Sequence, residues 1–338
     1  MTVNRQWILR RRPQGDVTQQ DLEFVETPLR DIAEGEVLVR NIYLSLDPTN
    51  RIWMSDQDQY LPPVEIGDVM RGGVIGVVEK SRSDRFKPGQ IVNPGLGGWQ
   101  DYTIAHEGML NATPSIPGVP LTAYMSVLGG TGLTAWFGMV DIGKPKPGET
   151  VVVSAAAGAV GSIAGQIAKL KGARVIGIAG GPAKCRWLTE ELGFDGAIDY
   201  KNEDVGAALD RLCPGGIDVN FENVGGKIMD EVISRMNNWG RVALCGMIST
   251  YNADGPAPGP SDFGRILMHR LLIQGFIVID YLPRAGEALA ELVPWILSGQ
   301  LKWKAHVEPG LENALDAMGR LFSGDHDGKL LVQISPEP

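Results

Sequence analysis

The stretch Val151-Val152-Val153-Ser154-Ala155-Ala156-Ala157-Gly158-Ala159-Val160-Gly161-Ser162 decides the fold of the second half of the chain. It reads as a buried strand, a tight turn of small residues and the start of a helix. Aligned to the pattern G-x-G-x-x-G, it has Ala156 in place of the first glycine and keeps Gly158 and Gly161. Gly158 would let the backbone approach a pyrophosphate, and Gly161 would let the helix lie close to the strand. The stretch therefore predicts a dinucleotide-binding unit, and the alternative is a tight turn without a ligand.

The sequence on both sides of this stretch predicts the fold class. Strand-like apolar runs alternate with helical segments of about 10–15 residues, as in βαβ units with a parallel sheet; the runs are 149–154, 173–179, 217–222 and 241–245. From 121 to 140 the apolar residues follow a helical spacing. Residues 1 to about 120 contain short strand-like runs between Gly and Pro, which predict an all-β barrel or sandwich. The expected class is α/β, with a doubly wound parallel sheet and a β-rich domain.

The segment after the strand at 173–179 bears on the choice of cofactor. NAD-binding units place Asp or Glu about 20 residues beyond the glycines, where it binds the ribose hydroxyls. Here the strand ends in Ile178-Ala179-Gly180-Gly181-Pro182 without a carboxylate, and Lys184 and Arg186 follow. A missing acid and an added cation favour the 2′-phosphate of NADP. The alternative is that both are solvated residues at a helix start, where a cation without an anion is mildly unfavourable.

Composition and charge exclude several classes of protein. The 338 residues contain 31 Lys and Arg against 40 Asp and Glu, and a net charge of −9 argues against a nucleic-acid partner. No uncharged run approaches the roughly 20 residues that span a bilayer, and the first residues lack the apolar core of a signal peptide. The cysteines are Cys185, Cys213 and Cys245, an odd number and far apart, so no disulfide framework is expected. We expect a cytoplasmic protein without a membrane partner.

Dispersed cysteines and histidines predict chemistry without a metal. Zinc sites draw on closely spaced Cys and His, which neither the cysteines nor His106, His269, His306 and His326 provide. Without a metal, a hydride needs a substrate that is already electrophilic, such as a carbon–carbon double bond conjugated to a carbonyl. Hydride addition at the β-carbon gives an enolate, which hydrogen-bond donors stabilise before a proton is delivered. Tyrosines and cofactor hydroxyls are the candidate donors.

Several motifs together resemble a known family. Besides the turn at 154–162, they are Tyr43-Leu44-Ser45-Leu46-Asp47-Pro48, Ala179-Gly180-Gly181-Pro182-Ala183-Lys184-Cys185, Glu222-Asn223-Val224-Gly225-Gly226-Lys227, Cys245-Gly246-Met247-Ile248-Ser249-Thr250-Tyr251-Asn252 and Gln274-Gly275-Phe276-Ile277-Val278. In these motifs the chain resembles the medium-chain dehydrogenase/reductase superfamily. Within it, the chain is similar to the zinc-free branch of prostaglandin, alkenal double-bond and curcumin reductases. The resemblance covers essentially the whole chain.

The resemblance implies an architecture and an activity. Residues 1–120 and the C-terminal return 291–338 would form a GroES-like β-barrel domain. A Rossmann NADP-binding domain, residues 121–290, would be inserted between them. The implied activity is NADPH-dependent reduction of the double bond of an α,β-unsaturated ketone or aldehyde. A homodimer is also implied, in which the strand-like run 271–278 pairs across a twofold axis.

The resemblance also implies roles for residues at matching positions. The pyrophosphate would be bound by Gly158, Ala159, Val160 and Gly161, and the adenosine phosphate by Lys184 and Tyr200. The nicotinamide half would be lined by Asn223, Cys245, Gly246, Ile248, Ser249, Thr250, Tyr251, Phe276, Ile277 and Val278. Tyr60 and Tyr251 would contact the substrate carbonyl as enolate stabilisers or proton donors. Hydrophobic packing is the alternative for Tyr60, and also for Tyr281, which follows the Phe276 segment.

The chain departs from the family pattern at two places. The branch commonly reads Asp-Pro-Tyr-Met-Arg-Gly, whereas this chain has Asp47-Pro48-Thr49-Asn50-Arg51-Ile52-Trp53-Met54. An aromatic residue is thus lost at the expected edge of the substrate pocket, and Trp53 stands nearby. Near the end, the family has Asn before Gly-Lys, and this chain has Asp327, which would weaken or reorient a cofactor contact.

Two other functions stay open on the sequence. A quinone reductase on the same scaffold would turn over quinones and leave enones untouched. A non-catalytic NADPH-binding protein would keep the phosphate site, act as a redox-responsive partner and oxidise no cofactor. Two tyrosine-bearing segments beside the cofactor motif favour catalysis, which the fold alone does not prove.

Overall fold

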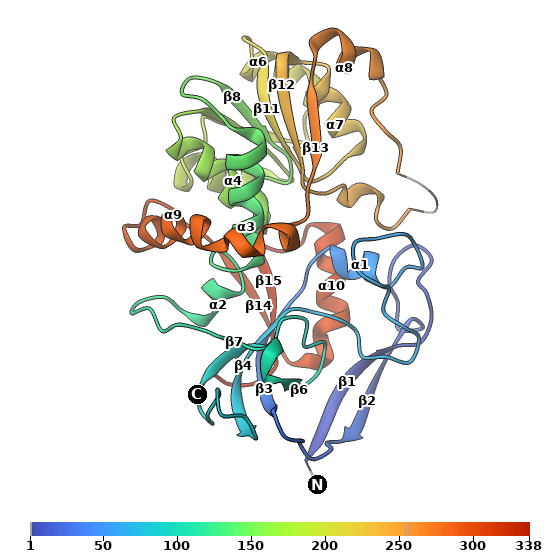
Figure 1. The fold of residues 1–338 in the computed structure, drawn as a ribbon. Helices are drawn as coiled ribbons and strands as arrows, with labels where there is room; N and C mark the ends of the chain where they lie inside the picture. Colours follow the sequence, from blue (N-terminus) through green and yellow to red (C-terminus); the bar gives the residue numbers. More distant parts are fainter. Residues whose placement is uncertain (1, 254, 256) are drawn as a thin grey trace. The chain divides into compact units, whose positions relative to one another are not determined.

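A computed structural model of the chain describes residues 2–253, 255 and 257–338. The chain forms two compact units, unit 1 from Met1–Met125 with Ala305–Pro338 and unit 2 from Ser126–Lys304. The two ends of the chain, blue and red in Figure 1, therefore belong to the same unit. The units change at 125/126 and 304/305, near the expected boundaries of 120/121 and 290/291. The assignment of a function to each segment stays a prediction.

Unit 1 is built mainly from antiparallel strands. A two-stranded sheet pairs β1 (Val3–Leu9) with β2 (Leu22–Pro28). A larger sheet has the order β14-β15-β3-β4-β5-β7, with β6 paired to β3. Its strands are β3 (Glu36–Ser45), β4 (Val74–Ser81), β5 (Ile91–Asn93), β6 (Tyr102–His106), β7 (Asn111–Ala112), β14 (Ala305–Pro309) and β15 (Lys329–Gln333). The expected closed barrel is not found among the described residues, because β7 has only two residues and its edge pairs with β5 alone.

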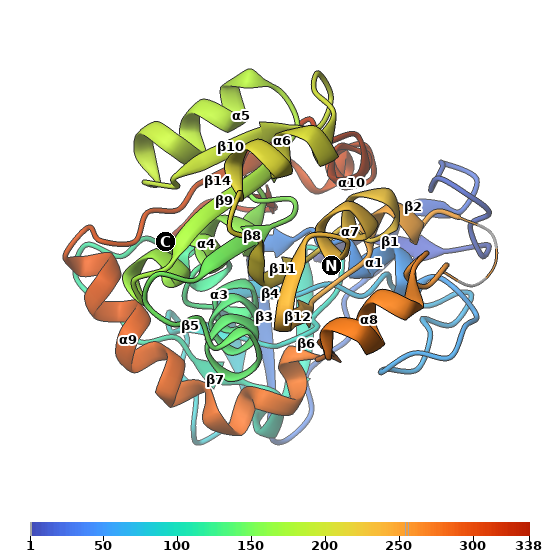
Figure 2. The same cartoon turned by 90° about the horizontal axis from the view of Figure 1, so that it is seen from above.

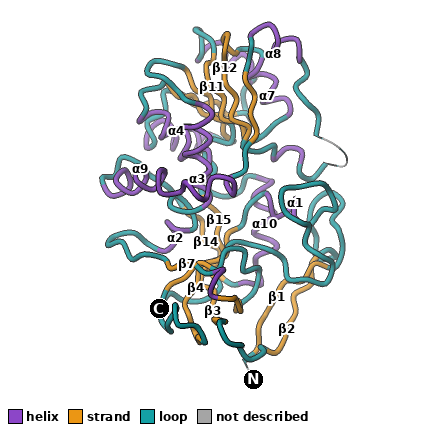
Figure 3. Tube along the Cα trace, in the orientation of Figure 1, coloured by secondary structure: helices purple, strands orange, loops and turns teal. Residues whose placement is uncertain are grey.

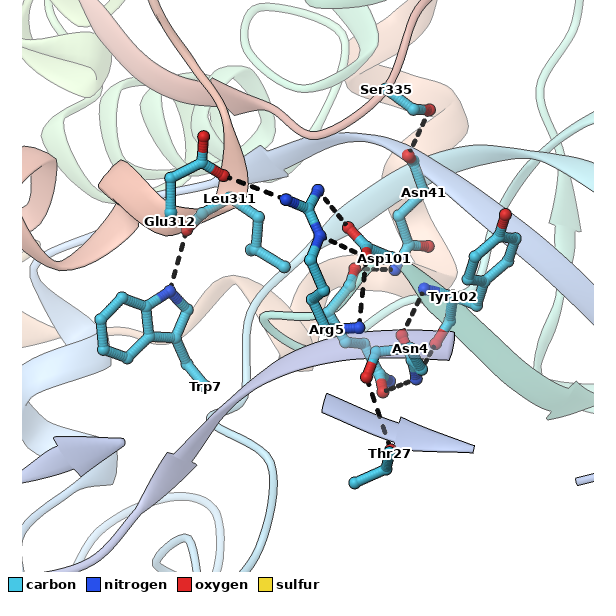
Figure 4. Close-up of polar contacts among 11 residues, drawn as sticks. Asn4, Arg5, Trp7, Thr27, Asn41, Asp101, Tyr102, Leu311, Glu312 and Ser335 are labelled. Carbon is cyan, nitrogen blue, oxygen red and sulfur yellow. Dashed lines mark hydrogen bonds and ion pairs between the residues drawn. The ribbon is translucent and has the colours of Figure 1, made fainter. Parts of the chain in front are cut away.

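The core of unit 1 forms where apolar side chains of the strands meet a helix. Trp7 and Trp99 are buried there in one cluster with Met318 of α10 (Ala314–Ser323). Figure 4 shows the polar contacts that attach β1: Arg5 Nε lies 2.8 Å from Asp101 Oδ2, and Trp7 Nε1 donates to the Leu311 carbonyl at 2.8 Å. The other helices of unit 1 are α1 (Thr49–Trp53) and α2 (Leu121–Tyr124).

Unit 2 contains a six-stranded sheet in which all neighbouring strands are parallel. Its order is β10-β9-β8-β11-β12-β13, and its strands appear in orange in the upper part of Figure 3. They are β8 (Thr150–Val153), β9 (Arg174–Ala179), β10 (Gly196–Asp199), β11 (Ile217–Glu222), β12 (Met236–Leu244) and β13 (Leu272–Gly275). The chain runs outward from β8 to β10 and then from β11 to β13, which is the order of a Rossmann fold. The predicted doubly wound sheet is therefore confirmed.

Helices cover both faces of this sheet, as Figure 2 shows. On one side lie α3 (Gly130–Phe137) and α4 (Ala159–Leu170), and on the other α6 (Val205–Leu212) and α7 (Gly226–Ile233). Leu209 of α6 and Val232 of α7 share a buried cluster with Val152 and Ile176 of the sheet, so each helix buries one apolar face. Unit 2 also contains α5 (Pro182–Arg186), α8 (Phe263–His269) and α9 (Ala285–Leu297).

The helical spacing over 121–140 does not form one helix. α2 ends at Tyr124, α3 begins at Gly130, and a π-helical turn follows at Gly138–Gly143. The glycines near residue 130 disfavour a continuous helix. A Cβ at Gly132 would also lie 1.8 Å from the Val127 carbonyl oxygen, so the start of α3 packs directly on the preceding loop.

Candidate active site

The carboxyl ends of the six parallel strands carry nearly all the residues predicted to bind cofactor. We call this side of the sheet the carboxyl edge. Gly158–Gly161 follow β8, Lys184 follows β9, Tyr200 follows β10, Asn223 follows β11, Cys245–Tyr251 follow β12 and Phe276–Val278 follow β13. The strand order reverses between β8 and β11, and ligands of such sheets bind outside the carboxyl ends at this point. Asp327 is the exception, because it belongs to unit 1, where it is exposed.

The turn between β8 and α4 is shaped to receive an anion. Ala155 has the left-handed φ of 45°, and the extended Gly158 is the N-cap of α4 without a side-chain cap. A Cβ at Gly161 would lie 2.5 Å from the Ala155 carbonyl oxygen, so any side chain there would separate helix and turn. The first turn of α4 contains no acidic residue, and its amides lack helical partners. These features fit a pyrophosphate at the helix N-terminus.

A buried glutamate holds the ends of β8 and β11 together. Glu222 is fully buried, and its Oε1 accepts hydrogen bonds from Ser154 Oγ at 2.8 Å and from the Val224 and Gly225 amides at 2.7 and 2.8 Å. Its Oε2 accepts from Asn220 Nδ2 at 2.9 Å. The carboxyl group therefore orders the segment that leads into the predicted nicotinamide site. Sequence reasoning missed Glu222 and Ser154, although a glutamate ending an apolar strand was the available signal.

Asn223 links β11 to the segment after β12. Its Nδ2 donates to the Ser154 carbonyl at 2.7 Å, and its own carbonyl accepts from the Ile248 amide at 3.0 Å. Ser249 reinforces the link, because its Oγ donates to the Val224 carbonyl at 2.6 Å. The structure thus brings the predicted residues around 223 and 248–249 together. One N–H of the Asn223 side chain already has a structural partner, which leaves its other N–H and its oxygen as the groups to offer a ligand.

Tyr251 is folded back onto its own loop. Its hydroxyl accepts a hydrogen bond from the Met247 amide at 3.0 Å, and a Cβ at Gly246 would lie 2.9 Å from that hydroxyl. A side chain at position 246 would therefore displace the Tyr251 hydroxyl from this hydrogen bond. Burial, together with the nearby Glu222 carboxyl, raises the pKa of the Cys245 thiol to about 12. Cys245 is therefore a neutral thiol at physiological pH and not a nucleophile.

The outer part of the carboxyl edge fits an additional phosphate. No carboxylate occurs between Ala179 and Pro182, as the sequence predicted for NADP. A Cβ at Gly180 would lie 3.0 Å from both the Tyr200 ring and the Lys201 side chain, so these two pack beside the end of β9. Tyr200 is 43% exposed, and Lys184 lies on α5 next to the same strand end. Lys201 is a second cation here that sequence reasoning did not single out.

The acid nearest to this phosphate site is turned toward the backbone. Asp199 accepts from the Gly181 amide at 2.7 Å, the Lys201 amide at 3.1 Å and Asn202 Nδ2 at 2.8 Å. Burial alone would raise the pKa of Asp199, but these hydrogen bonds outweigh it and hold the pKa below its usual value. Asp199 therefore orders the loops around the site.

In unit 2, Phe276 is buried and Tyr281 is partly buried, and both pack against other aromatic rings. The Phe276 ring lies 6.4 Å from that of Phe221, and the Tyr281 ring lies 4.6 Å from that of Phe137. The side chain of Phe276 is thus part of the core, so a contact from Phe276 to a ligand has to come from its main chain, whereas Ile277 and Val278 are only partly buried. For Tyr281 the contacts favour the packing alternative.

In unit 1, Tyr60 lies in a cluster with the residues that depart from the family pattern. We call Asp47, Thr49, Trp53, Tyr60, Arg71 and Lys329 the Tyr60 cluster. Trp53 Nε1 donates to the Tyr60 hydroxyl at 3.1 Å, and Thr49 Oγ1 lies 2.5 Å from it. Tyr60 is 40% exposed, and partial burial raises its pKa above the usual value against the opposing effect of these hydrogen bonds. Tyr60 is therefore hydrogen-bonded at its polar end as well as packed.

A buried lysine joins the two departing motifs. Lys329 is almost fully buried, and its Nζ donates to the Leu46 carbonyl at 2.6 Å and to Asp47 Oδ1 at 2.8 Å. Sequence reasoning examined Asp327, two residues earlier, and missed Lys329. The pair Gly328-Lys329 gave no hint in the sequence of a partner far away in the chain.

A metal ion would be held by a group of side chains that lie close together. Across residues 2–253, 255 and 257–338, no three His, Cys, Asp or Glu side chains gather as a metal site would require. Independence from metal stays a prediction.

Within the same residues, no helix combines the length and the apolar character that crossing a membrane requires.

Comparison with known proteins agrees with this geometry. Residues 5–113 match the family model described as the N-terminal domain of oxidoreductase, and residues 159–298 match the model described as zinc-binding dehydrogenase. The NADPH-dependent curcumin reductase of Escherichia coli is 41% identical over 98% of this chain and 97% of its own length. The NADP(+)-dependent 2-alkenal reductase of Nicotiana tabacum is 38% identical over 99% of this chain and 98% of its own length.

A solved structure extends the similarity to three dimensions. CurA from Vibrio vulnificus, crystallised in complex with NADPH, superposes with a TM-score of 0.93 and 43% sequence identity, covering 98% of this chain and all of that one. The strand order, the glycine turn and these similarities over nearly the full length agree. The chain is an oxidoreductase of the medium-chain dehydrogenase/reductase superfamily and belongs to its zinc-free branch of curcumin, alkenal and prostaglandin reductases.

Proposed function

We propose that this oxidoreductase uses NADPH to reduce the carbon–carbon double bond of α,β-unsaturated ketones or aldehydes. The observation that carries the proposal is the carboxyl edge, where a glycine turn and helix N-terminus are combined with Lys184, Tyr200 and Lys201 and with no acid at the end of β9. The relatives named as curcumin reductase and 2-alkenal reductase support this substrate class.

Bound NADPH supplies the hydride, and the chain's residues bind, orient and donate a proton. The amides at the start of α4 would bind the pyrophosphate, and Lys184 with Tyr200 would bind the 2′-phosphate. Asn223 and the segments 245–251 and 276–278 would line the nicotinamide. The hydroxyls of Tyr60 and Tyr251 are the candidate donors to the substrate carbonyl, where negative charge develops as the enolate forms. Asp327, exposed in unit 1, is the least supported of the predicted cofactor residues.

The test is NADPH consumption, followed by absorbance, with a simple enone, a medium-chain 2-alkenal and a quinone, and with NADH as the control cofactor. Turnover of the enone or alkenal with a clear preference for NADPH is expected. Turnover of the quinone alone would contradict the proposal in favour of a quinone reductase. Tight NADPH binding without oxidation by any of them would leave a cofactor-binding protein without catalysis.

We also propose that the protein forms a homodimer through β13. This strand is the last of the sheet, and the apolar side chains on and around it are at least half exposed: Trp239, Phe263, Leu267, Met268 and Leu272. An open strand edge with exposed apolar neighbours is typical of a twofold interface. Sedimentation should give a dimer at micromolar concentration, and Leu267→Glu should give a monomer. Leu297→Glu on α9, at another exposed leucine, is the control, and a monomeric wild-type protein would contradict the proposal.

The compartment proposed for this enzyme is the cytoplasm. All three cysteines are free thiols, which suits a reducing environment. The proposed partner is a small enone or enal rather than a nucleic acid, consistent with the net charge of −9.

A further inference from the structure

The hydroxyl of Tyr60 has two side-chain partners from the same helix. Thr49 and Trp53 stand at the two ends of α1, and both reach the same phenolic oxygen, at 2.5 and 3.1 Å. Tyr60 comes from the loop that follows this helix. Two side chains of the segment 47–54, where the chain departs from the family pattern, therefore meet on one hydroxyl.

The bonding capacity of these groups assigns their roles. A phenolic oxygen has one proton and two acceptor sites, and an indole N–H can only donate, so Trp53 fills one acceptor site of Tyr60. A threonine hydroxyl can both accept and donate. Thr49 can thus accept from Tyr60 as long as no substrate is bound, and it can turn to donate when the phenolic proton points to the substrate instead. Both neighbours are then donors to the phenolate.

We propose that Thr49 and Trp53 are positioning residues for Tyr60, which aim its proton and stabilise the phenolate that remains after the proton is given to substrate. This inference rests on the proposed function, in which Tyr60 is a candidate proton donor. In the step, hydride from NADPH forms a C–H bond at the β-carbon and leaves NADP⁺. The Tyr60 O–H bond breaks as its proton passes to the enolate, which gives the saturated carbonyl compound. The phenolate then takes a proton from water.

The charged groups that face Tyr60 act in opposite directions. Arg71 lies over the Trp53 ring, with its guanidinium carbon 5.5 Å from the ring centre, and its charge favours the phenolate. The Asp47 carboxyl disfavours it, but Asp47 is paired with Lys329. Burial raises the pKa of Tyr60, whereas the hydrogen bonds from Thr49 and Trp53 lower it. Loss of either hydrogen bond should therefore raise the pKa further.

The test replaces each neighbour while keeping its shape. Trp53→Phe keeps an aromatic ring but removes the N–H, and Thr49→Val keeps the volume but removes the hydroxyl. The pKa of Tyr60 is measured by ultraviolet titration of tyrosinate as the difference from Tyr60→Phe. We expect Trp53→Phe to raise this pKa by about one unit, the effect of one hydrogen bond. With an enone, kcat should fall about tenfold while the KM for NADPH stays the same, and Thr49→Ser should restore what Thr49→Val loses.

The matched control is Trp7→Phe in the same unit. Trp7 also donates its indole N–H, at 2.8 Å, but to the Leu311 carbonyl. This variant should leave the Tyr60 titration and the pH profile of kcat unchanged. If Trp53→Phe and Thr49→Val also leave both unchanged, the inference is wrong.

The titration separates this inference from the proposed function, because it needs no turnover. A shifted Tyr60 pKa in a protein that reduces no enone would overturn the proposed function and, with it, the proton transfer. Enone turnover that Tyr60→Phe does not slow would overturn the role of Tyr60 as donor. Enone turnover that depends on Tyr60, with no pKa shift in either variant, would overturn the roles of Thr49 and Trp53.

Discussion

The carboxyl edge of unit 2 and the Tyr60 cluster of unit 1 are built from different kinds of contact. At the carboxyl edge, backbone groups provide most partners, such as the Val224 and Gly225 amides on Glu222. In the Tyr60 cluster, side chains meet side chains, and Lys329 reaches Asp47 across 282 positions of sequence. The geometry of the carboxyl edge therefore depends on the absence of side-chain volume at a few positions. The geometry of the Tyr60 cluster depends on the identity of each side chain.

The largest effect is expected when volume is added at the carboxyl edge. In Gly161→Val, the Cβ would lie 2.5 Å from the Ala155 carbonyl oxygen and 2.9 Å from Ala156 Cα, both parts of the backbone. We expect a loss of about 3 kcal/mol in the free energy of unfolding and loss of NADPH binding. Denaturant unfolding and a fluorescence titration with NADPH measure these. Gly286→Val, where a Cβ meets nothing within 4 Å, is the control. Normal NADPH binding by Gly161→Val would show that the site does not depend on the close approach of α4 to the turn before it.

A smaller loss is expected when side-chain identity changes in the Tyr60 cluster. Lys329→Met keeps the length of the side chain but leaves Asp47 and the Leu46 carbonyl without their partner. Since the Asp47 side chain is 33% exposed, water offsets part of the cost, and we expect a loss of about 2 kcal/mol. Denaturant unfolding measures it, with Lys80→Met, at an exposed position of β4, as the control. Equal stability of the two variants would show that the cluster does not depend on this pair.

The third effect concerns cofactor choice at the outer carboxyl edge. Lys184→Ala removes a cation beside the proposed 2′-phosphate, so we expect the preference for NADPH over NADH to fall about tenfold with little change in stability. The ratio of kcat/KM for the two cofactors measures it. Lys171→Ala, which removes a cation paired with Glu291 at the far end of α4, should leave the ratio unchanged. An unchanged ratio in Lys184→Ala would mean that Tyr200 and Lys201 bind the phosphate without it.

The smallest expected effect is on the pH dependence of stability, and it comes from the buried thiol of Cys213 in the core of unit 2. Burial raises the pKa of Cys213 from 9.0 to about 11. Between these values the unfolded chain loses the proton and the folded chain keeps it, so this group's contribution to stability falls as pH rises from about 9 to 11. Between pH 8 and pH 10, Cys213→Ala should therefore lose about 1 kcal/mol less stability than the wild-type protein. Equal losses in denaturant unfolding would mean that the thiol titrates normally in the folded state.

Prediction from sequence worked best where neighbouring residues in the chain are enough to define the backbone geometry. The turn around Gly158 and Gly161 and the run of strands gave the parallel sheet, because a strand–turn–helix unit needs only neighbours in the chain. The β-rich domain was predicted as well, but the described residues show no closed barrel, and the pairing of a short edge strand such as β7 could not be read from composition. Glu222 was missed for a related reason, because its hydrogen bonds come from β8 and from its own following loop only after the sheet forms.

By itself, the sequence determined the alternation of strands and helices, although not β10, together with the glycine turn and the missing acid after β9, since these depend on backbone freedom and charge along the chain. Only the tertiary structure decided that Lys329 pairs with Asp47, that Thr49 and Trp53 share the hydroxyl of Tyr60, and that the Phe276 ring belongs to the core. These contacts join side chains through space. Their partners are set by how sheets and loops pack, which residue spacing along the chain does not record.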